Sequence, residues 1–181
     1  MQVLENFECL EDNFPTPLGQ MAAAIRGDNE LWLALALASG EFDDLEPQQF
    51  AAACAGLLME NNRPDTWIYY RPSSPAVEAL EGLRPLRRRI FQEQRRQDIQ
   101  IPVWLEWDFI ALVEHWALEA SWQDLCDNTS LDEGDIVRIL RRTLDFLSHI
   151  SHVPYLSSAV KNTARQAAFL VDRFPVKEAS E

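Results

Sequence analysis

The stretch TSLDEGDIVRILRRTLDFL, residues 129–147, decides the fold. It predicts the start of a helix, because Ser130 can cap it and Glu133, three residues later, can complete a capping box. Asp132, Glu133 and Asp135 place negative charge in the first turn, where the helix dipole favours it. The residues that follow repeat with helical spacing, so we expect one long amphipathic helix.

The two faces of this helix differ in character. One face is an apolar stripe that we expect to be buried: Ile136, Ile139, Leu140, Thr143, Phe146, Leu147 and Ile150. The other face is a charged ridge with spacings of three and four: Asp135, Arg138, Arg142, Asp145 and His149. A row of arginines opposite a buried face suits contact with a polyanion, whereas a solvated helix with intrahelical ion pairs is the alternative.

Helical periodicity continues along the rest of the chain, with no convincing run of strand-like alternation. We therefore expect an all-α, single helical-bundle domain of about seven helices over residues 1–181. Residues 3–175 are expected to be ordered, and 176–181 to be a frayed tail. The apolar segment LWLALALA, residues 31–38, is expected to be the central helix.

Proline and capping residues predict the helix boundaries. The expected starts are at Pro17, Asp28, Pro47 and Ser74-Pro75, each typical of an N-cap or a first helical position. Pro85 is expected to kink or divide the helix over 76–98. Residues 61–75 are expected to form a Pro-rich loop, in which TWIYYRPSSP suits a short extended segment. The inward stripe of the last helix is predicted to be Leu156, Val160, Ala164, Ala167 and Val171.

Composition limits the class of protein. With 181 residues, 47% of them apolar, the chain can form one compact core. No apolar run is long enough to span a membrane, and no secretory leader opens the chain. Three widely spaced cysteines, Cys9, Cys54 and Cys126, indicate reduced and buried thiols, so a cytoplasmic location without membrane contact is expected.

Charge argues against strong free-standing nucleic-acid binding. The chain carries 16 basic and 29 acidic side chains, a net charge of -13, which repels RNA at long range. The distribution is uneven, because residues 63–100 contain eight arginines and five acidic residues. A local basic strip on an acidic domain is therefore expected.

Within that segment, Arg84, Arg88 and Arg95 fall on one helical face. Phosphate contact by Arg88 and Arg95 would be independent of nucleotide sequence and sensitive to salt. Contact with a neighbouring domain, or ion pairing with the acidic N-terminal third of this domain, are the alternatives.

The sequence offers little for catalysis. There is no GxxxxGK[ST] segment, and six glycines with two lysines provide no phosphate-binding loop. His149 and His152 share no spacing with a cysteine or carboxylate that would complete a metal site. Cys126 has no sequence partner that would activate its thiol. We expect no enzymatic activity, metal or cofactor in this chain alone.

Several segments together resemble a known family. The string EGDIVRILRR, residues 133–142, resembles the signature of the DSHCT domain, the C-terminal helical domain of exosome-type DExH (superfamily 2) RNA helicases. WALEASWQDLCDNTSLDEGD (116–135), TPLGQMAAAI (16–25) and NELWLALALASGEFDDLEPQQFAAACAGLL (29–58) are similar to other parts of the domain. The resemblance covers roughly 3–175, and FLSHISHVPYLS after the signature looks most like cyanobacterial members.

The resemblance implies a function. It implies an accessory domain of an ATP-dependent RNA helicase, in which RecA-like motor domains precede this segment and bind ATP and Mg²⁺. The signature helix is implied to lie across the path of single-stranded RNA, with Arg142 and Asp145 contacting it; Arg138, one turn back, extends the strip. The aspartate at 145 departs from the expected glutamate, which shortens its reach. A docking module for a nuclease complex or a regulator, without RNA contact, is the alternative.

Overall fold

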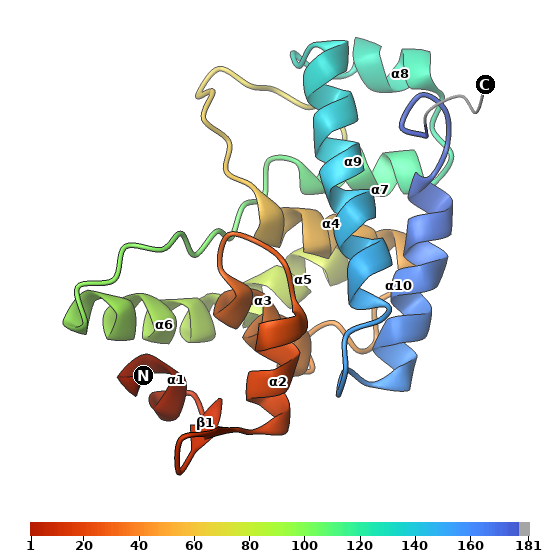
Figure 1. Ribbon diagram of the computed structural model, residues 1–181. Coiled ribbons are helices and arrows are strands. Elements are labelled where there is room, and N and C mark those ends of the chain that lie inside the picture. The colour runs from red at the N-terminus through yellow and green to blue at the C-terminus, as the bar shows by residue number, and fades with distance from the viewer. Residues whose placement is uncertain (178–181) are drawn as a thin grey trace.

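The computed structural model describes residues 1–177 as a bundle of helices with one small hairpin (Figure 1). The helices are α1 (Gln2–Asn6), α2 (Pro17–Ala24), α3 (Glu30–Ala38), α4 (Pro47–Leu58), α5 (Ser74–Gly82), α6 (Arg84–Arg96), α7 (Ile110–Ala117), α8 (Trp122–Asp127), α9 (Glu133–Ile150) and α10 (Ser158–Val171). The hairpin pairs β1 (Leu10–Glu11) with β2 (Phe14–Pro15). The all-α expectation is confirmed, with more short helices than expected.

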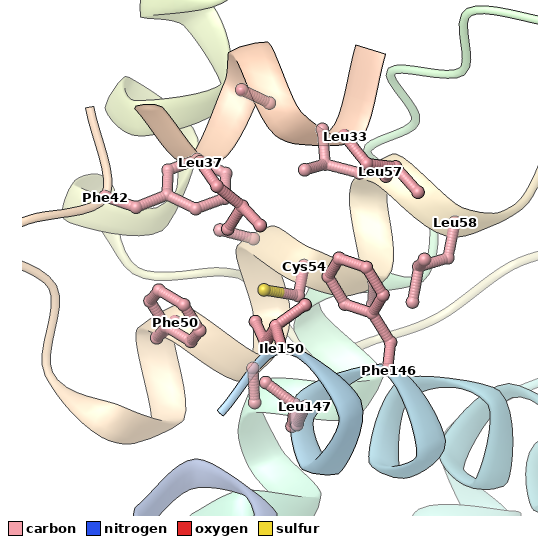
Figure 2. Packing of buried hydrophobic residues seen from close by; sticks show 14 of the residues in the cluster. Leu33, Leu37, Phe42, Phe50, Cys54, Leu57, Leu58, Phe146, Leu147 and Ile150 are labelled. Carbon is pink, nitrogen blue, oxygen red and sulfur yellow. The ribbon is translucent and has the colours of Figure 1, made fainter. Parts of the chain in front are cut away.

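Helix α4 is the element around which the bundle forms. Every residue from Phe50 to Leu58 is buried, and the run of alanines lets neighbouring helices approach closely. Helices α5, α7, α9 and α10 all contact it. The expected central helix, α3, is buried over most of its length but lies to one side, against α2 and α6. Figure 2 shows the core where α3, α4 and α9 meet, with the Cys54 thiol among aromatic and aliphatic side chains.

The long helix α9 carries the predicted stripe but begins differently. All seven predicted residues of the apolar stripe are buried. The helix cap, however, is Asp132, whose carboxylate accepts a hydrogen bond from the Asp135 backbone N–H at 2.7 Å. The prediction of a Ser130 cap is wrong, because the Ser130 hydroxyl instead accepts from the Trp67 N–H at 2.9 Å. The Ser130 side chain thus binds the backbone of a segment that is distant in sequence, at Trp67, instead of capping α9.

The boundaries of α2, α3, α5 and α6 lie within about a residue of the positions that the proline and capping residues predict. Thr16 caps α2 ahead of Pro17, as that proline predicted. Asn29, not Asp28, caps α3 by accepting from the Trp32 N–H. The helix expected over 76–98 divides beside Pro85, with α5 ending at Gly82 and α6 beginning at Arg84. The stripe predicted for the last helix is also buried.

The Pro-rich loop is extended where expected. Ile68 forms an isolated antiparallel bridge with Thr129, and the Tyr69 N–H donates to the Asn128 carbonyl at 2.9 Å. The start of the predicted tail is not frayed, because Val176 is buried and its carbonyl accepts from Arg141 Nε at 3.0 Å. Residues 178–181 of that tail lie outside the described residues.

Residues 97–109, between α6 and α7, form a segment that we call the strap. Figure 1 shows it doubling back along α6 toward the centre of the bundle. Its carbonyl groups are satisfied by side chains from α6, α3 and the α3 cap instead of by a second strand. These bonds join Asn29 Nδ2 to Pro102 O (3.0 Å), Arg87 Nε to Val103 O (2.6 Å) and Trp32 Nε1 to Trp104 O (2.8 Å).

The strap reaches α4 at a glycine. The Glu106 N–H donates to the Gly56 carbonyl at 2.8 Å. A Cβ atom at position 56 would lie 2.7 Å from the Glu106 carbonyl oxygen and 2.8 Å from Leu80 Cδ1. Only glycine therefore allows the strap, α5 and α4 to meet at this distance.

Candidate nucleic-acid interface

A groove runs beside the polar face of α9. It consists of two adjoining cavities of about 290 and 320 Å³, and both are lined by Arg142 and Trp104. The strap supplies Trp104, the turn before α3 supplies Asp28, and the loop after α4 supplies Arg63. Three segments that are distant in sequence thus form the wall opposite α9.

Arg142 lies at the junction of the two cavities. Its guanidinium stands 5.5 Å from the centroid of the Trp104 ring and forms an ion pair with Asp28. Its side chain is 44% exposed, and that of Asp28 is 46% exposed. A guanidinium plane held near an indole can still offer its free edge to phosphate or its other face to a base.

Arg138 lies one turn toward the start of α9 and is more exposed than Arg142. Its side chain is 74% exposed, and it donates to Asp135 Oδ1 at 2.6 Å. Asp135 also pairs with Arg63 at 2.5 Å and is itself buried. The prediction of an exposed ridge is therefore wrong at Asp135. The loop after α4 packs over this residue, and its carboxylate pairs with both Arg63 and Arg138.

The other end of the ridge lies in the smaller cavity. Asp145 is exposed and lines this cavity, with no hydrogen bond or ion pair to any residue of 1–177. His149 is half-buried, with Nε2 2.8 Å from the Ala24 carbonyl oxygen, so it joins α9 to α2. Asp145 is thus available as an acceptor, whereas His149 is committed to the fold.

The charges of the groove balance. Four arginines line it (Arg26, Arg63, Arg138 and Arg142), together with four carboxylates (Asp28, Glu60, Asp135 and Asp145). In a chain of net charge -13 this is a comparatively basic surface, but it is not a positive one. Recognition here depends on the placement of each arginine more than on long-range attraction.

The two remaining predicted residues, Arg88 and Arg95, are elsewhere. Both are exposed on α6 and line a different groove, between α6 and the strap. Arg84, predicted on the same face, pairs with Glu81 at 2.9 Å and stands over the Trp107 ring at 5.0 Å. The structure thus divides the five predicted residues between two surfaces.

Sequence reasoning missed Trp104, Asp28 and Arg63 as members of the α9 groove. A tryptophan in the non-helical run IPVWLEW is a signal that a side chain is held by tertiary contacts. The sequence predicts a helix cap at Asp28 and a loop around Arg63. Their roles follow from how the strap and two loops fold against α9.

None of the three cysteines is among the residues that line this groove. Among residues 1–177, no three His, Cys, Asp or Glu side chains cluster as a metal site would require. The three cysteines are free thiols, and burial raises the pKa of Cys9, of Cys54 and of Cys126. Acidic neighbours, Glu133 and Asp127, raise the pKa of Cys126 further. A thiol with a raised pKa is protonated at neutral pH and a poor nucleophile.

No helix in the described part of the chain is long and apolar enough to cross a membrane.

Fold and groove together define a class: a helical domain whose long amphipathic helix borders an arginine-bearing groove. The chain belongs to the DSHCT (NUC185) domain family, whose family model matches residues 12–179. The resemblance to the DSHCT domain seen in the sequence is thereby confirmed, whereas the likeness to cyanobacterial members stays a prediction.

Relatives among known proteins are helicases. The chain is 38% identical over 166 residues to the chloroplastic DExH-box ATP-dependent RNA helicase DExH15 of Arabidopsis thaliana, covering 90% of this chain and 14% of that protein. It is 23% identical to DExH11 of the same plant, over 78% of this chain and 11% of the relative. It is 25% identical to an uncharacterized helicase of Schizosaccharomyces pombe, over 80% of this chain and 14% of the relative. The chain therefore spans about a seventh or less of these relatives.

Proposed function

We propose that this chain is an accessory domain of an ATP-dependent RNA helicase, and that its α9 groove contacts single-stranded RNA. Membership of the DSHCT family and the helicase relatives support the first part. The position of Arg142, partly exposed beside Trp104 and between two cavities, supports the second and carries the proposal. In the parent protein, RecA-like motor domains would bind ATP and Mg²⁺ and pack against this domain.

Each side chain of the groove has a distinct part in such contact. Arg142 can bind a phosphate with its fork, or stack a base on the face away from Trp104. Arg138 extends into solvent and can bind the next phosphate along the strand. Asp145 can accept a hydrogen bond from a ribose 2′-hydroxyl or a base amino group, which a phosphate contact alone cannot supply.

The internal ion pair of Arg142 does not prevent this contact. An exposed pair such as Arg142–Asp28 contributes about 0.2–1 kcal/mol. A charge-assisted hydrogen bond to phosphate is of at least that strength, about 1.5–3 kcal/mol. RNA can therefore displace Asp28 at small cost, while Trp104 keeps the guanidinium oriented.

The test is Arg142→Ala in the full-length parent enzyme. RNA-stimulated ATP hydrolysis and unwinding should fall about tenfold, the equivalent of one lost charge-assisted contact. The thermal midpoint should stay within about 2 °C, because the ion pair and the ring contact that are lost involve a side chain that is 44% exposed. Lys161→Ala on α10, outside both cavities, removes the same charge and should leave unwinding unchanged. Unchanged unwinding in the Arg142 variant would remove this residue from the site.

A second candidate function is a protein-docking module without RNA contact. Four exposed carboxylates in the turn between α3 and α4 favour it, because they suit a basic protein surface such as that of a nuclease complex: Glu41, Asp43, Asp44 and Glu46. Titrating labelled single-stranded RNA at two salt concentrations distinguishes the two. Salt-sensitive binding that is lost in the Arg138→Ala/Arg142→Ala variant supports RNA contact, whereas no binding even when joined to the motor supports docking.

A further inference from the structure

A second groove lies between α6 and the strap, and its charge differs from that of the α9 groove. It is a cavity of about 500 Å³. Four arginines line it, Arg84, Arg87, Arg88 and Arg95, with the aromatic rings of Phe91 and Trp107. No carboxylate is among the side chains that line this cavity, although the chain as a whole is strongly acidic.

Most arginines of α6 are engaged within the fold. Arg87 donates to the Val103 carbonyl and holds the strap. Arg89 donates to the Asn6 carbonyl at 2.8 Å and stands over the Phe7 ring, which attaches α1. Arg96 pairs with Glu93 at 2.5 Å, and Arg84 pairs with Glu81. These contacts account for the basic residues that the fold itself uses.

Arg88 and Arg95 have no such use. Both are exposed, and neither makes a hydrogen bond, ion pair or ring contact with any residue in the described range 1–177. Phe91 lies between them on the same helical face, at spacings of three and four, and is 47% exposed. An ion pair with the acidic N-terminal third, one of the alternatives considered for them, is not present in this range. Two unpaired cations that flank an exposed aromatic ring form a surface without an internal partner.

We propose that this α6 groove is a second binding site for single-stranded nucleic acid, which holds the phosphodiester backbone through Arg88 and Arg95. It rests on the proposed function for the class of ligand, but on different residues. Seven helical residues separate the two arginines by about 10 Å. This distance lets the two arginines contact different phosphates of one strand. Phe91 offers an exposed ring on which a base can stack regardless of sequence, and Trp107, which has Arg84 over its ring, lines the same groove.

The strap separates the two grooves. Side chains alternate sides along an extended backbone, so Trp104 faces one way and both Leu105 and Trp107 face the other. The cavities agree, since Trp104 lines the α9 groove and Leu105 and Trp107 line the α6 groove. The strap thus presents one indole to each surface.

The experiment measures binding of a fluorescent uridine homopolymer to the 181-residue chain by anisotropy, across a series of salt concentrations. Arg88→Ala/Arg95→Ala should weaken binding about tenfold at low salt. It should also reduce the slope of log affinity against log salt by about 1.4, since each lost phosphate contact on a single strand contributes about 0.7. Arg71→Ala/Arg96→Ala removes the same charge outside the groove and should change the slope little. Circular dichroism confirms that both variants fold.

Other outcomes separate this inference from the proposed function. If Arg88→Ala/Arg95→Ala binds as its control does, the α6 site is overturned. If a polyglutamate peptide of equal charge competes as well as RNA, the groove recognises an acidic protein surface and the inference is again overturned. If Arg142→Ala binds normally while the α6 variant does not, the α6 site stands without the α9 site, whose own test is unwinding by the full-length enzyme. Crosslinking of a 4-thiouridine strand to the Phe91 and Trp107 peptides in the Arg142 variant would support the α6 site directly.

Discussion

Arg142 is the residue at which internal and external contacts compete. Asp28 neutralises its guanidinium, and the Trp104 ring lies 5.5 Å from it, so a phosphate that binds Arg142 must replace a carboxylate. Arg138 is in a different state, because its partner Asp135 is buried and also pairs with Arg63. Displacing a buried carboxylate from two arginines is costly. Of the two ion pairs, only Arg142–Asp28 can be replaced by a phosphate contact at small cost.

Asp28→Asn should therefore strengthen RNA binding. The substitution keeps the size and polarity of the side chain and removes a negative charge beside the phosphate position, worth about 1 kcal/mol in water, or about fivefold in affinity. The unfolding free energy should change by less than about 1 kcal/mol, because the pair is exposed. Anisotropy titration of single-stranded RNA measures the first effect, and urea unfolding measures the second.

The control is Asp43→Asn, which removes an equal charge in the acidic turn between α3 and α4, outside the groove. Equal gains in both variants would mean that net charge alone governs binding. Weaker binding by Asp28→Asn would mean that Asp28 holds Arg142 in its binding orientation instead of competing for it.

At the scale of the element, α9 shows which features a sequence encodes locally. Its buried stripe was predictable because burial repeats with the period of the helix, from Ile136 to Ile150. Its cap was not, because Ser130 is used by Trp67, a residue 63 positions away. The burial of Asp135 could not be predicted from the sequence of α9 either, because it depends on the loop that carries Arg63.

The strap shows the same limit for the candidate site. Residues 97–109 have no periodicity, and their position is set by side-chain donors on α3 and α6. Arg138, Arg142 and Asp145 could be named from the resemblance and the helical face. Trp104 could not, because nothing near it in sequence indicates that it faces α9.

The close contact between the strap and α4 predicts that one added methyl group at position 56 lowers the stability of the fold. Gly56→Ala would place Cβ 2.7 Å from the Glu106 carbonyl oxygen, and the Glu106 N–H donates to the Gly56 carbonyl, which limits how far the strap can move away. Alanine gains about 1 kcal/mol in helix propensity over glycine. Overpacking against fixed backbone costs about 1–3 kcal/mol. We expect a net loss of unfolding free energy and weaker RNA binding at both grooves, because the strap forms a wall of each.

Urea unfolding and anisotropy measure these two losses. Gly134→Ala is the matched control, since that glycine is exposed in the first turn of α9 and its Cβ would meet only the Asp132 carboxylate, at 3.3 Å. Its stability should change less than that of Gly56→Ala. A Gly56→Ala protein as stable as the unmodified chain would contradict the described packing of strap, α5 and α4.

At the scale of the molecule, the distribution of charge determines how each proposed site could bind RNA. A chain of net charge -13 repels RNA, and its α9 groove is neutral, so affinity must come from the few placed arginines and from the strand being delivered. A motor that threads RNA past the domain would supply that delivery. The α6 groove, which has no carboxylate in its lining, is the place where the isolated chain can bind without such help.

The whole bundle also determines how the central thiol responds to pH. Cys54 lies in α4 among apolar side chains (Figure 2) and is completely buried. Helices α5, α7, α9 and α10 contact that helix. Burial raises the pKa of this thiol well above its ordinary value of 9.0. Above pH 9 the unfolded chain therefore loses a proton that the folded chain keeps. The resulting contribution to stability is fully present below pH 9 and is lost as the pH rises, by up to about 1.4 kcal/mol per pH unit.

Cys54→Ala should remove this dependence. Urea unfolding between pH 7 and pH 10 (about the range in which a protein thiol of ordinary pKa titrates), in reductant, gives the unfolding free energy of both proteins. The difference between them should shrink above pH 9, because only the unmodified chain gains from ionising its unfolded thiol at position 54. Cys9, Cys126 and the tyrosines titrate in both proteins and cancel in the comparison. Parallel pH profiles would show that the thiol ionises equally in both states, which is incompatible with a core closed on all sides by these helices.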